Sequence, residues 1–189
     1  MRNEKIEVLD KVEKIVYLTQ PSPIVLISTI DKLGVRNLAP FAMFTSCSTR
    51  PPMIAVGISP KSDTFKNITK TKEFVVGIPS ESILPQVCQA GQGYPPEVDE
   101  FRETGLTPYK SKQVTPARIA ECVVNLECKL KWHQEAGNHH IVVGIVVEAD
   151  INSDVFSSDK IKLRIAIPQV YHVTGSSFLV GGELVDVKS

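Results

Sequence analysis

Short runs rich in valine and isoleucine recur along this 189-residue chain, separated by proline, glycine, serine and aspartate. Runs of this kind are typical of strands, because β-branched side chains pack well on a pleated surface and turn-forming residues end the pairing. Strands that do not alternate with long helices indicate a mainly β, antiparallel barrel rather than a doubly wound sheet. No G-x-G-x-x-G motif follows any of the runs. The predicted strands cover residues 23–30, 53–58, 74–78, 122–130 and 141–149.

Two of these runs carry further information. The first is followed by the turn-forming sequence DKLG at residues 31–34 and by an extended stretch at 35–37, so we predict a hairpin there. Within the run 122–130, apolar side chains at even positions alternate with mostly polar side chains at odd positions. A period of two predicts that this strand lines the core with one face.

Helical signals are fewer and shorter. Ser62 and Asp63 can cap a helix over the segment FKNITKT at 65–71. A second helix is predicted over 81–90, with Pro85 either in its first turn or at a break. A short third helix is predicted over 97–104. The predicted fold is therefore a strand-rich barrel with a few short helices.

The composition is that of a globular protein with one core. Hydrophobic residues make up 42% of the chain and charged residues 22%, close to the averages for folded domains. A chain of this length supports one core, so we predict a single domain over residues 1–189. Lys+Arg and Asp+Glu are both 21. Because no basic cluster is present, we predict neither a nucleic-acid partner nor a membrane partner.

The amino-terminal sequence and the cysteines indicate a cytoplasmic protein. The opening residues MRNEKIEVLDKVEK lack the apolar region of a secretory signal. The longest apolar stretch, residues 141–147, is far shorter than the roughly 20 residues that span a bilayer. The cysteines form no C-x-x-C pair, so reduced thiols are predicted rather than disulfides or a structural zinc. They are Cys47, Cys88, Cys122 and Cys128.

The stretch from residue 37 to residue 67 contains three features that point to a nucleotide-like ligand. Small residues at 45–48 (TSCS) would let backbone N–H groups approach the pyrimidine edge of a flavin. Lys61 with the hydroxyls of Ser62 and Thr64 stands at a predicted helix amino terminus, which favours a phosphate. The extended stretch 37–41 (NLAPF) is suited to form a wall beside an aromatic ring.

Each feature also has an ordinary structural interpretation. Ser-Cys-Ser is more often a turn or the end of a strand than a binding site, and Ser62 with Asp63 is first an N-cap. The carboxylate of Asp63 would repel an anion unless it turns away. Spacing alone therefore leaves the site unproven.

The order of these motifs resembles the signature of the flavin reductase-like family, in particular its flavoredoxin branch. Asn-x-Ala-Pro-Phe is followed by Ser-Cys-Ser, by Arg-Pro-Pro-Met, and by Lys-Ser-Asp-Thr-x-x-Asn-Ile. Further along, the segments at 98–107 and 120–128 are similar to flavoredoxin segments, and Gly-Asn-His-His at 137–140 resembles the Gly-Asp-His-Thr stretch of the family. The resemblance covers about residues 21–182. It implies an FMN-binding split barrel, usually a homodimer with the flavin near the subunit interface.

The resemblance also implies roles for individual residues. His139 matches the family histidine beside the flavin and the nicotinamide, and is the implied catalytic residue. Asn138 stands where the family commonly has Asp, and Ile145 where Glu is common, so nicotinamide handling is less firmly implied than FMN binding. The residues matching the stretches that line the isoalloxazine ring are Asn37, Ala39, Pro40, Ser46, Cys47 and Ser48. Those matching the phosphate side are Lys61, Ser62, Thr64 and Asn67.

The remaining histidines and Cys47 suggest no further chemistry. His133 and His172 are distant in sequence from the pair His139-His140, and no H-E-x-x-H spacing is present, so we predict no metal site. The role of His140 stays open between a flavin-side acid and a strand end facing water. No base is indicated beside Cys47, so we predict that it is a small buried residue packing near the ring.

The resemblance implies an NAD(P)H:flavin oxidoreductase in which reduced nicotinamide, NADH or NADPH, delivers hydride to bound FMN. FAD is left possible as the flavin. The cofactor carries the chemistry, so no catalytic triad or carboxylate pair is required. The alternative is an FMN electron-transfer protein that is reduced by a protein partner and lacks its own nicotinamide site. A sensing or storage role for the flavin is a third hypothesis.

Overall fold

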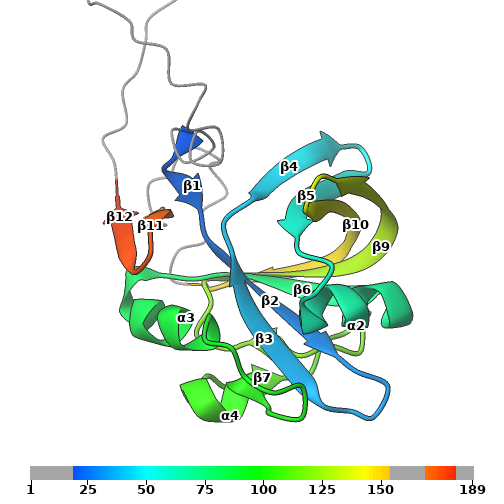
Figure 1. The fold of residues 1–189 in the computed structure, drawn as a ribbon, viewed down its shortest axis with the longest axis horizontal. Helices are drawn as coiled ribbons and strands as arrows, with labels where there is room; N and C mark the ends of the chain where they lie inside the picture. Colours follow the sequence, from blue (N-terminus) through cyan, green and yellow to red (C-terminus); the bar gives the residue numbers. More distant parts are fainter. Residues whose placement is uncertain (1–18, 154–168, 182–189) are drawn as a thin grey trace, which may run out of the picture.

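A seven-stranded antiparallel sheet forms the centre of the computed structural model, which describes residues 19–153 and 169–181. Its strand order is β3-β2-β6-β9-β10-β5-β4, and it curls so that β3 also contacts β5 (Figure 1). Its strands are β2 (Val25–Ile30), β3 (Arg36–Phe41), β4 (Phe44–Thr49), β5 (Pro52–Ile58), β6 (Glu73–Ile78), β9 (Val124–Ala136) and β10 (His139–Ile151). All five predicted strands are present, and β2 and β3 form the predicted hairpin.

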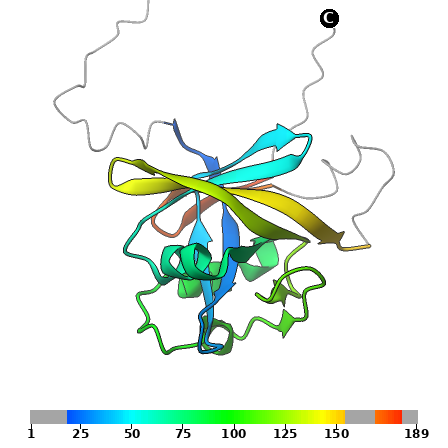
Figure 2. The ribbon, with the colours of Figure 1, turned by 90° about the vertical axis from the view of Figure 1, so that its right-hand side faces the viewer.

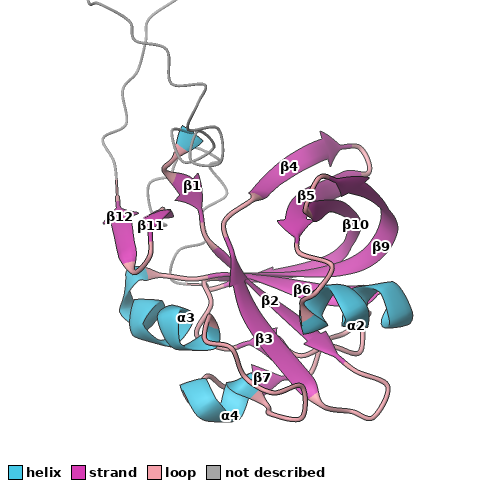
Figure 3. Ribbon diagram, in the orientation of Figure 1, coloured by secondary structure: helices cyan, strands magenta, loops and turns pink. Residues whose placement is uncertain are grey.

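Two smaller sheets and three short α-helices complete the described part of the chain (Figure 3). The three-stranded sheet has the order β1-β11-β12, and β7 pairs with β8. No described helix is long and apolar enough to cross a membrane. The small strands are β1 (Ser22–Pro23), β7 (Pro108–Tyr109), β8 (Arg118–Ile119), β11 (Val170–Thr174) and β12 (Ser177–Val180). The helices are α2 (Asp63–Thr71), α3 (Leu84–Ala90) and α4 (Glu100–Thr104).

Local sequence explains where the helices begin and end. The Ser62 hydroxyl accepts a hydrogen bond from the backbone N–H of Phe65, at 3.2 Å, so the predicted cap of α2 is confirmed. The predicted helix over 81–90 is divided, because Pro85 takes the first turn of α3 and a single 3₁₀ turn (Glu81–Ile83) precedes it. The third helix is shorter than predicted and starts after its cap, Asp99.

Strand β2 is buried on both faces and separates two hydrophobic cores. Val25 and Ile27 face the barrel interior, while Leu26 faces the side covered by α3 and α4, which explains why the first three residues of this strand are all apolar. The barrel core contains Val25, Ile27, Ile54, Val56, Ile58, Ile68, Phe74, Val76, Cys128 and Val142. The second core contains Ile24, Leu26, Leu38, Ile83, Val87, Ala90, Phe101, Leu106, Ile119, Cys122 and Val170.

The β9–β10 hairpin is long, and bulges bend it over the barrel core. Register shifts fall between Val143 and Gly144 and between Val146 and Glu148, and a bulge increases the local bend and twist of a strand. A Cβ atom on Gly144 would lie 2.5 Å from the Phe74 ring. Only glycine at position 144 therefore lets β10 pass this close to the ring. Figure 2 shows the hairpin crossing the molecule above the helices.

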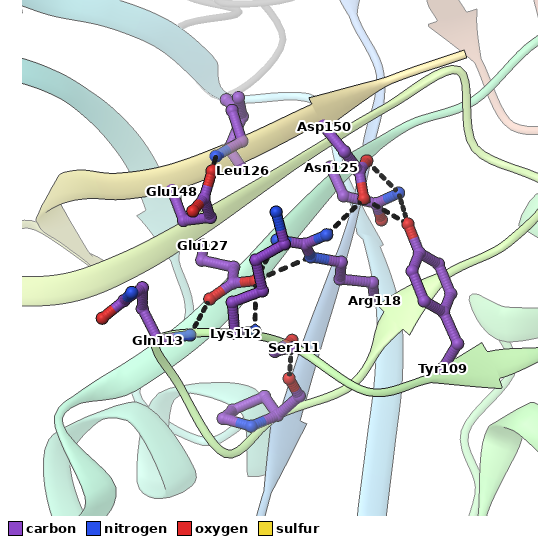
Figure 4. A network of polar contacts seen from close by, with 12 residues as sticks. Tyr109, Ser111, Lys112, Gln113, Arg118, Asn125, Leu126, Glu127, Glu148 and Asp150 are labelled. Carbon is purple, nitrogen blue, oxygen red and sulfur yellow. Dashed lines mark hydrogen bonds and ion pairs between the residues drawn. The ribbon is translucent and has the colours of Figure 1, made fainter. Parts of the chain in front are cut away.

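The prediction that β9 buries only its apolar face is incomplete, because its polar face is buried as well. Asn125 and Glu127 are 1% and 0% exposed. The Glu127 carboxylate accepts hydrogen bonds from the backbone N–H groups of Lys112 (2.8 Å) and Gln113 (2.6 Å) and from Arg118 Nε (2.6 Å) (Figure 4). Periodicity cannot reveal these partners, since they come from a distant loop and from β8.

Asp150 and Tyr109 extend this network to the surface. Arg118 Nη1 donates to Asp150 Oδ2 at 2.6 Å, and Asn125 Nδ2 donates to Asp150 Oδ1 at 3.1 Å. The Tyr109 hydroxyl donates to the same carboxylate. Burial and the Asp150 carboxylate raise the pKa of Tyr109 to about 12, so this hydroxyl keeps its proton near neutral pH. The network thus fastens the 108–119 segment to β9 and β10.

Removing the Glu127 carboxylate should destabilise the protein strongly. Glu127→Ala leaves Arg118 as a buried, partly uncompensated cation and removes the acceptor of two backbone N–H groups. We expect a loss of about 3–5 kcal/mol in the free energy of unfolding, measured by urea denaturation. The control is Glu121→Ala, which removes an exposed acceptor of the Thr107 N–H and should cost less than about 1 kcal/mol. Equal losses in the two variants would contradict the role given to Glu127.

Acid should weaken the same network. Although burial acts in the opposite direction, the hydrogen bonds and the positive charge of Arg118 hold the pKa values of Glu127 and Asp150 below their usual ranges. Such carboxylates stabilise the fold above their unfolded-state pKa values, about 4, and this stabilisation is lost as the pH falls through the lower folded-state values. Urea unfolding between about pH 6 and pH 3 should therefore show a declining free energy of unfolding, with a shallower decline in Asp150→Asn. A flat wild-type profile would refute this.

Candidate functional site

A hollow of about 350 Å³ lies on the outer face of the barrel, between β4, β5 and the tip of the β9–β10 hairpin. Strand register brings its walls together, because Thr45 lies opposite Ala55 and Ile141 lies opposite Gly57. The Gly57 N–H donates to the Met43 carbonyl at 2.8 Å, which places Met43 at the edge of the hollow. The lining residues are Met43, Thr45, Ala55, Val56, Gly57, Ala136, Asn138, His139 and Ile141.

His139 stands in this hollow with a fixed orientation. Its Nδ1 lies 2.7 Å from Asn138 Oδ1, and a carbonyl oxygen only accepts hydrogen bonds, so Nδ1 carries a proton in this contact. Asn138, the position at which the chain departs from the family pattern, therefore still orients the ring. It does so as a neutral acceptor, without the negative charge of an aspartate.

The Ser46–Ser48 stretch lies on β4, the last strand of the curled sheet. A register shift between Ser46 and Ser48 places Cys47 in a bulge against β5, and Ser48 Oγ donates to the Pro51 carbonyl at 2.7 Å. An edge strand has backbone donors and acceptors directed away from its one neighbour, as contact with a ligand's polar edge requires. The prediction that Cys47 is buried is wrong, because its place on this bulged edge leaves it exposed.

The phosphate-side stretch forms the amino terminus of α2. Lys61 is exposed directly before the cap residue Ser62, where unpaired N–H groups and the helix dipole favour an anion. The Asp63 carboxylate accepts from Lys66 Nζ at 2.8 Å, so its negative charge is partly offset. Asp63 therefore repels a phosphate at this helix end less strongly than an unpaired carboxylate would.

Three of the predicted ligand-binding side chains instead form an internal network. Asn37 Oδ1 accepts from Thr64 Oγ1 at 2.8 Å and from Thr29 Oγ1 at 3.1 Å, and Asn67 Nδ2 donates to Thr29 Oγ1 at 3.1 Å. Asn37 Nδ2 donates to Glu100 Oε1 at 2.9 Å. These contacts join β2, β3, α2 and α4, so the three side chains fix the position at which α2 begins.

The two remaining predicted residues lie on β3. Ala39 is partly buried, and Pro40 lines a different cleft, of about 450 Å³, between β3, α3 and the β11–β12 hairpin. The structure therefore distributes the predicted residues over the His139 hollow, the β4 edge, the α2 amino terminus and this second cleft. Met43 and Gly57 line the hollow but were missed, since only the strand register brings them near His139.

Comparison with known proteins identifies the family. Residues 18–186 match the flavin reductase like domain, so the chain belongs to that family. An uncharacterized protein of Aquifex aeolicus is 40% identical over 132 residues, which cover 67% of each chain.

Solved structures confirm the split barrel as the fold. Nitrilotriacetate monooxygenase component B from Bacillus cereus superposes with a TM-score of 0.87 at 22% identity, covering 99% of this chain and 98% of the other. The flavoredoxin of Desulfovibrio vulgaris gives a TM-score of 0.78 at 24% identity, covering 89% and 91%. The predicted mainly β, antiparallel split barrel with a few short helices is thus confirmed.

Proposed function

We propose that this chain is an NAD(P)H:flavin oxidoreductase that holds FMN as one domain over residues 1–189 and acts in the cytoplasm. The observation that carries the proposal is His139, oriented by Asn138 in an open and mostly apolar hollow, within a chain of the flavin reductase like family. Bound FMN would supply a hydride acceptor, and NADH or NADPH the hydride.

The residues present fit such a cofactor at both ends. At the ring end, the apolar hollow lies beside the exposed β4 edge, where Ser46, Cys47 and Ser48 offer small side chains and backbone donors. Ala39 and Pro40 on β3 lie outside this hollow, and Pro40 lines the second cleft. At the phosphate end, Lys61 and Ser62 stand at the amino terminus of α2. Asn37, Thr64 and Asn67 contribute by holding that terminus against β2 and β3.

In this proposal the chain's own groups bind, orient and shield rather than form bonds. The β4 backbone donors would stabilise negative charge on the polar edge of a reduced ring. His139, with its Nδ1 proton directed to Asn138, would present Nε2 to the nicotinamide or the flavin. The apolar walls would exclude part of the water from the reacting rings.

A second copy of the chain would complete the site. The side chains around the hollow are apolar and open to solvent, with Met43 55% exposed and Ile141 42% exposed, and Trp132 on β9 is 48% exposed. Contiguous exposed apolar side chains are typical of interaction surfaces. We propose a homodimer that buries this face, and reduced flavin would pass electrons to a small molecule or an acceptor protein.

The competing function is an electron carrier that a protein partner reduces. The similarity in fold to the flavoredoxin of Desulfovibrio vulgaris favours it. So do Asn138 and Ile145, which stand where the family pattern commonly has acidic residues.

Anaerobic NADH or NADPH should bleach the flavin absorbance of the FMN-loaded protein without any other protein present. His139→Ala should slow this bleaching about tenfold to a hundredfold, because it removes a group that orients the reacting rings. His140→Ala, next in sequence but on the opposite face of β10, is the control and should react at the wild-type rate. Wild-type flavin that stays oxidised with both nucleotides would replace the proposal with the partner-reduced carrier.

Lys61→Ala should weaken FMN binding while leaving riboflavin binding unchanged, because Lys61 is proposed to meet the phosphate that riboflavin lacks. We expect the FMN dissociation constant to rise about tenfold, equivalent to about 1.4 kcal/mol, measured by quenching of flavin fluorescence. Lys70→Ala, in the last turn of α2, is the matched control and should bind both flavins normally. Equal weakening for both flavins would place the phosphate elsewhere.

A further inference from the structure

The β9–β10 hairpin brings together two histidines that are seven residues apart in sequence. In the strand register His133 lies opposite Val142, and His140 lies opposite Glu135. Directly opposed residues share a face, and so do residues two apart on one strand, so the two imidazoles are diagonal neighbours. Their Nδ1 atoms are 3.3 Å apart. His133 and His140 are therefore neighbours in space, although no signal in the sequence indicated this contact.

The phenyl ring of Phe65, in the first turn of α2, packs against both imidazoles. Ring centroids are 5.3 Å apart for Phe65 and His133 and 4.6 Å apart for Phe65 and His140. These are ordinary aromatic contact distances. The contacts restrict the ring orientations, so less side-chain entropy remains to be lost when both rings bind one ligand.

We propose that His133 and His140 bind one divalent transition-metal ion of the Zn²⁺ class through their Nδ1 atoms. Zn–N bonds of about 2.0–2.1 Å at a tetrahedral angle place two ligand nitrogens about 3.3–3.4 Å apart, which matches the separation seen here. At this separation one imidazole must donate a proton to the other, whereas a metal ion accepts both lone pairs. Imidazole is a preferred ligand of such ions.

Glu135 is the third ligand in this proposal. It lies opposite His140 on the same face of the hairpin and is exposed. Among the described residues no group of three His, Cys, Asp or Glu side chains is already gathered around one point. Glu135 would therefore have to change rotamer on binding, and water would fill the fourth position.

The metal site lies on the opposite face of the hairpin from the His139 hollow, and its neighbour Phe65 is in the first turn of α2, whose amino terminus is the proposed phosphate end of the flavin site. Consecutive residues of a strand point to opposite faces: His139 enters the outer hollow, while His140 packs on Phe65 at the end of the barrel core. Metal binding can therefore be measured without flavin, and the proposal does not depend on the oxidoreductase activity.

Isothermal titration of the full-length, chelator-treated protein with Zn²⁺ tests the site. We expect one ion per chain, with affinity lowered at least about tenfold in His133→Ala and in His140→Ala, since each removes one of the ligands. Glu135→Gln should weaken binding less. His139→Ala and His172→Ala are matched controls and should bind as the wild type does.

Titration with Co²⁺ gives a second, spectroscopic measurement, because the tetrahedral ion should give an absorption band that both histidine variants lose. Thermal melting of each variant shows whether it has folded; if an alanine variant has not, His133→Asn or His140→Asn replaces it. Zn²⁺ retained by the exposed thiols of Cys47 and Cys88 would remain in the His133→Ala/His140→Ala double variant. Wild-type binding that is absent, or is unchanged in the double variant, would overturn the proposal.

Discussion

The burial of β2 on both faces is the constraint on which the rest of the structure depends. The strand separates the barrel core from the core under α3 and α4, and most of the described strands and helices contribute a side chain to one of these two cores. Its last residues change from apolar to polar, and Ser28 and Thr29 are fully buried. The Thr29 hydroxyl forms hydrogen bonds with Asn37 and Asn67. The strand that separates the cores therefore also holds the start of α2.

Backbone geometry links the burial of β2 to the position of the candidate site. Because α2 is held at its amino terminus, Lys61 and the end of β5 have a fixed place beside the tip of the β9–β10 hairpin. The two bulges bend that hairpin over Phe74. Because consecutive residues of a strand point to opposite faces, the neighbours His139 and His140 have different surroundings, one an open hollow and the other an aromatic cluster. One hairpin thereby supplies one histidine to the proposed flavin site and two to the proposed metal site.

Local signals in the sequence predicted the elements well, because turn formers, caps and apolar runs act within a few residues. Ser62, Pro85 and the DKLG turn each fulfil the role that their chemistry predicts. Contacts that depend on strand register were harder to predict from the sequence. The pairing of Gly57 with Ile141 depends on the register between β5 and β10, and the approach of His133 to His140 depends on the register that the turn between β9 and β10 sets. Likewise, Asn37 and Thr64 matched a ligand-binding pattern, but their side chains form a hydrogen bond with each other although they are 27 residues apart in sequence.

Two buried glutamates show why residue type alone could not predict the electrostatics. Burial disfavours the charged form of both. For Glu127 the backbone N–H groups of Lys112 and Gln113 and the Arg118 guanidinium outweigh burial, and the pKa of its carboxyl is lowered. For Glu100 burial prevails over the hydrogen bonds from Asn37 and Leu38, and neighbouring Asp99 adds repulsion, so its pKa is raised. Glu100 therefore destabilises the fold as the pH rises through its pKa, whereas Glu127 does so as the pH falls. The carboxylate beside the α2 anchor and the carboxylate under the β9–β10 hairpin respond to acid in opposite directions, because two backbone N–H donors and a buried cation together outweigh burial only at Glu127.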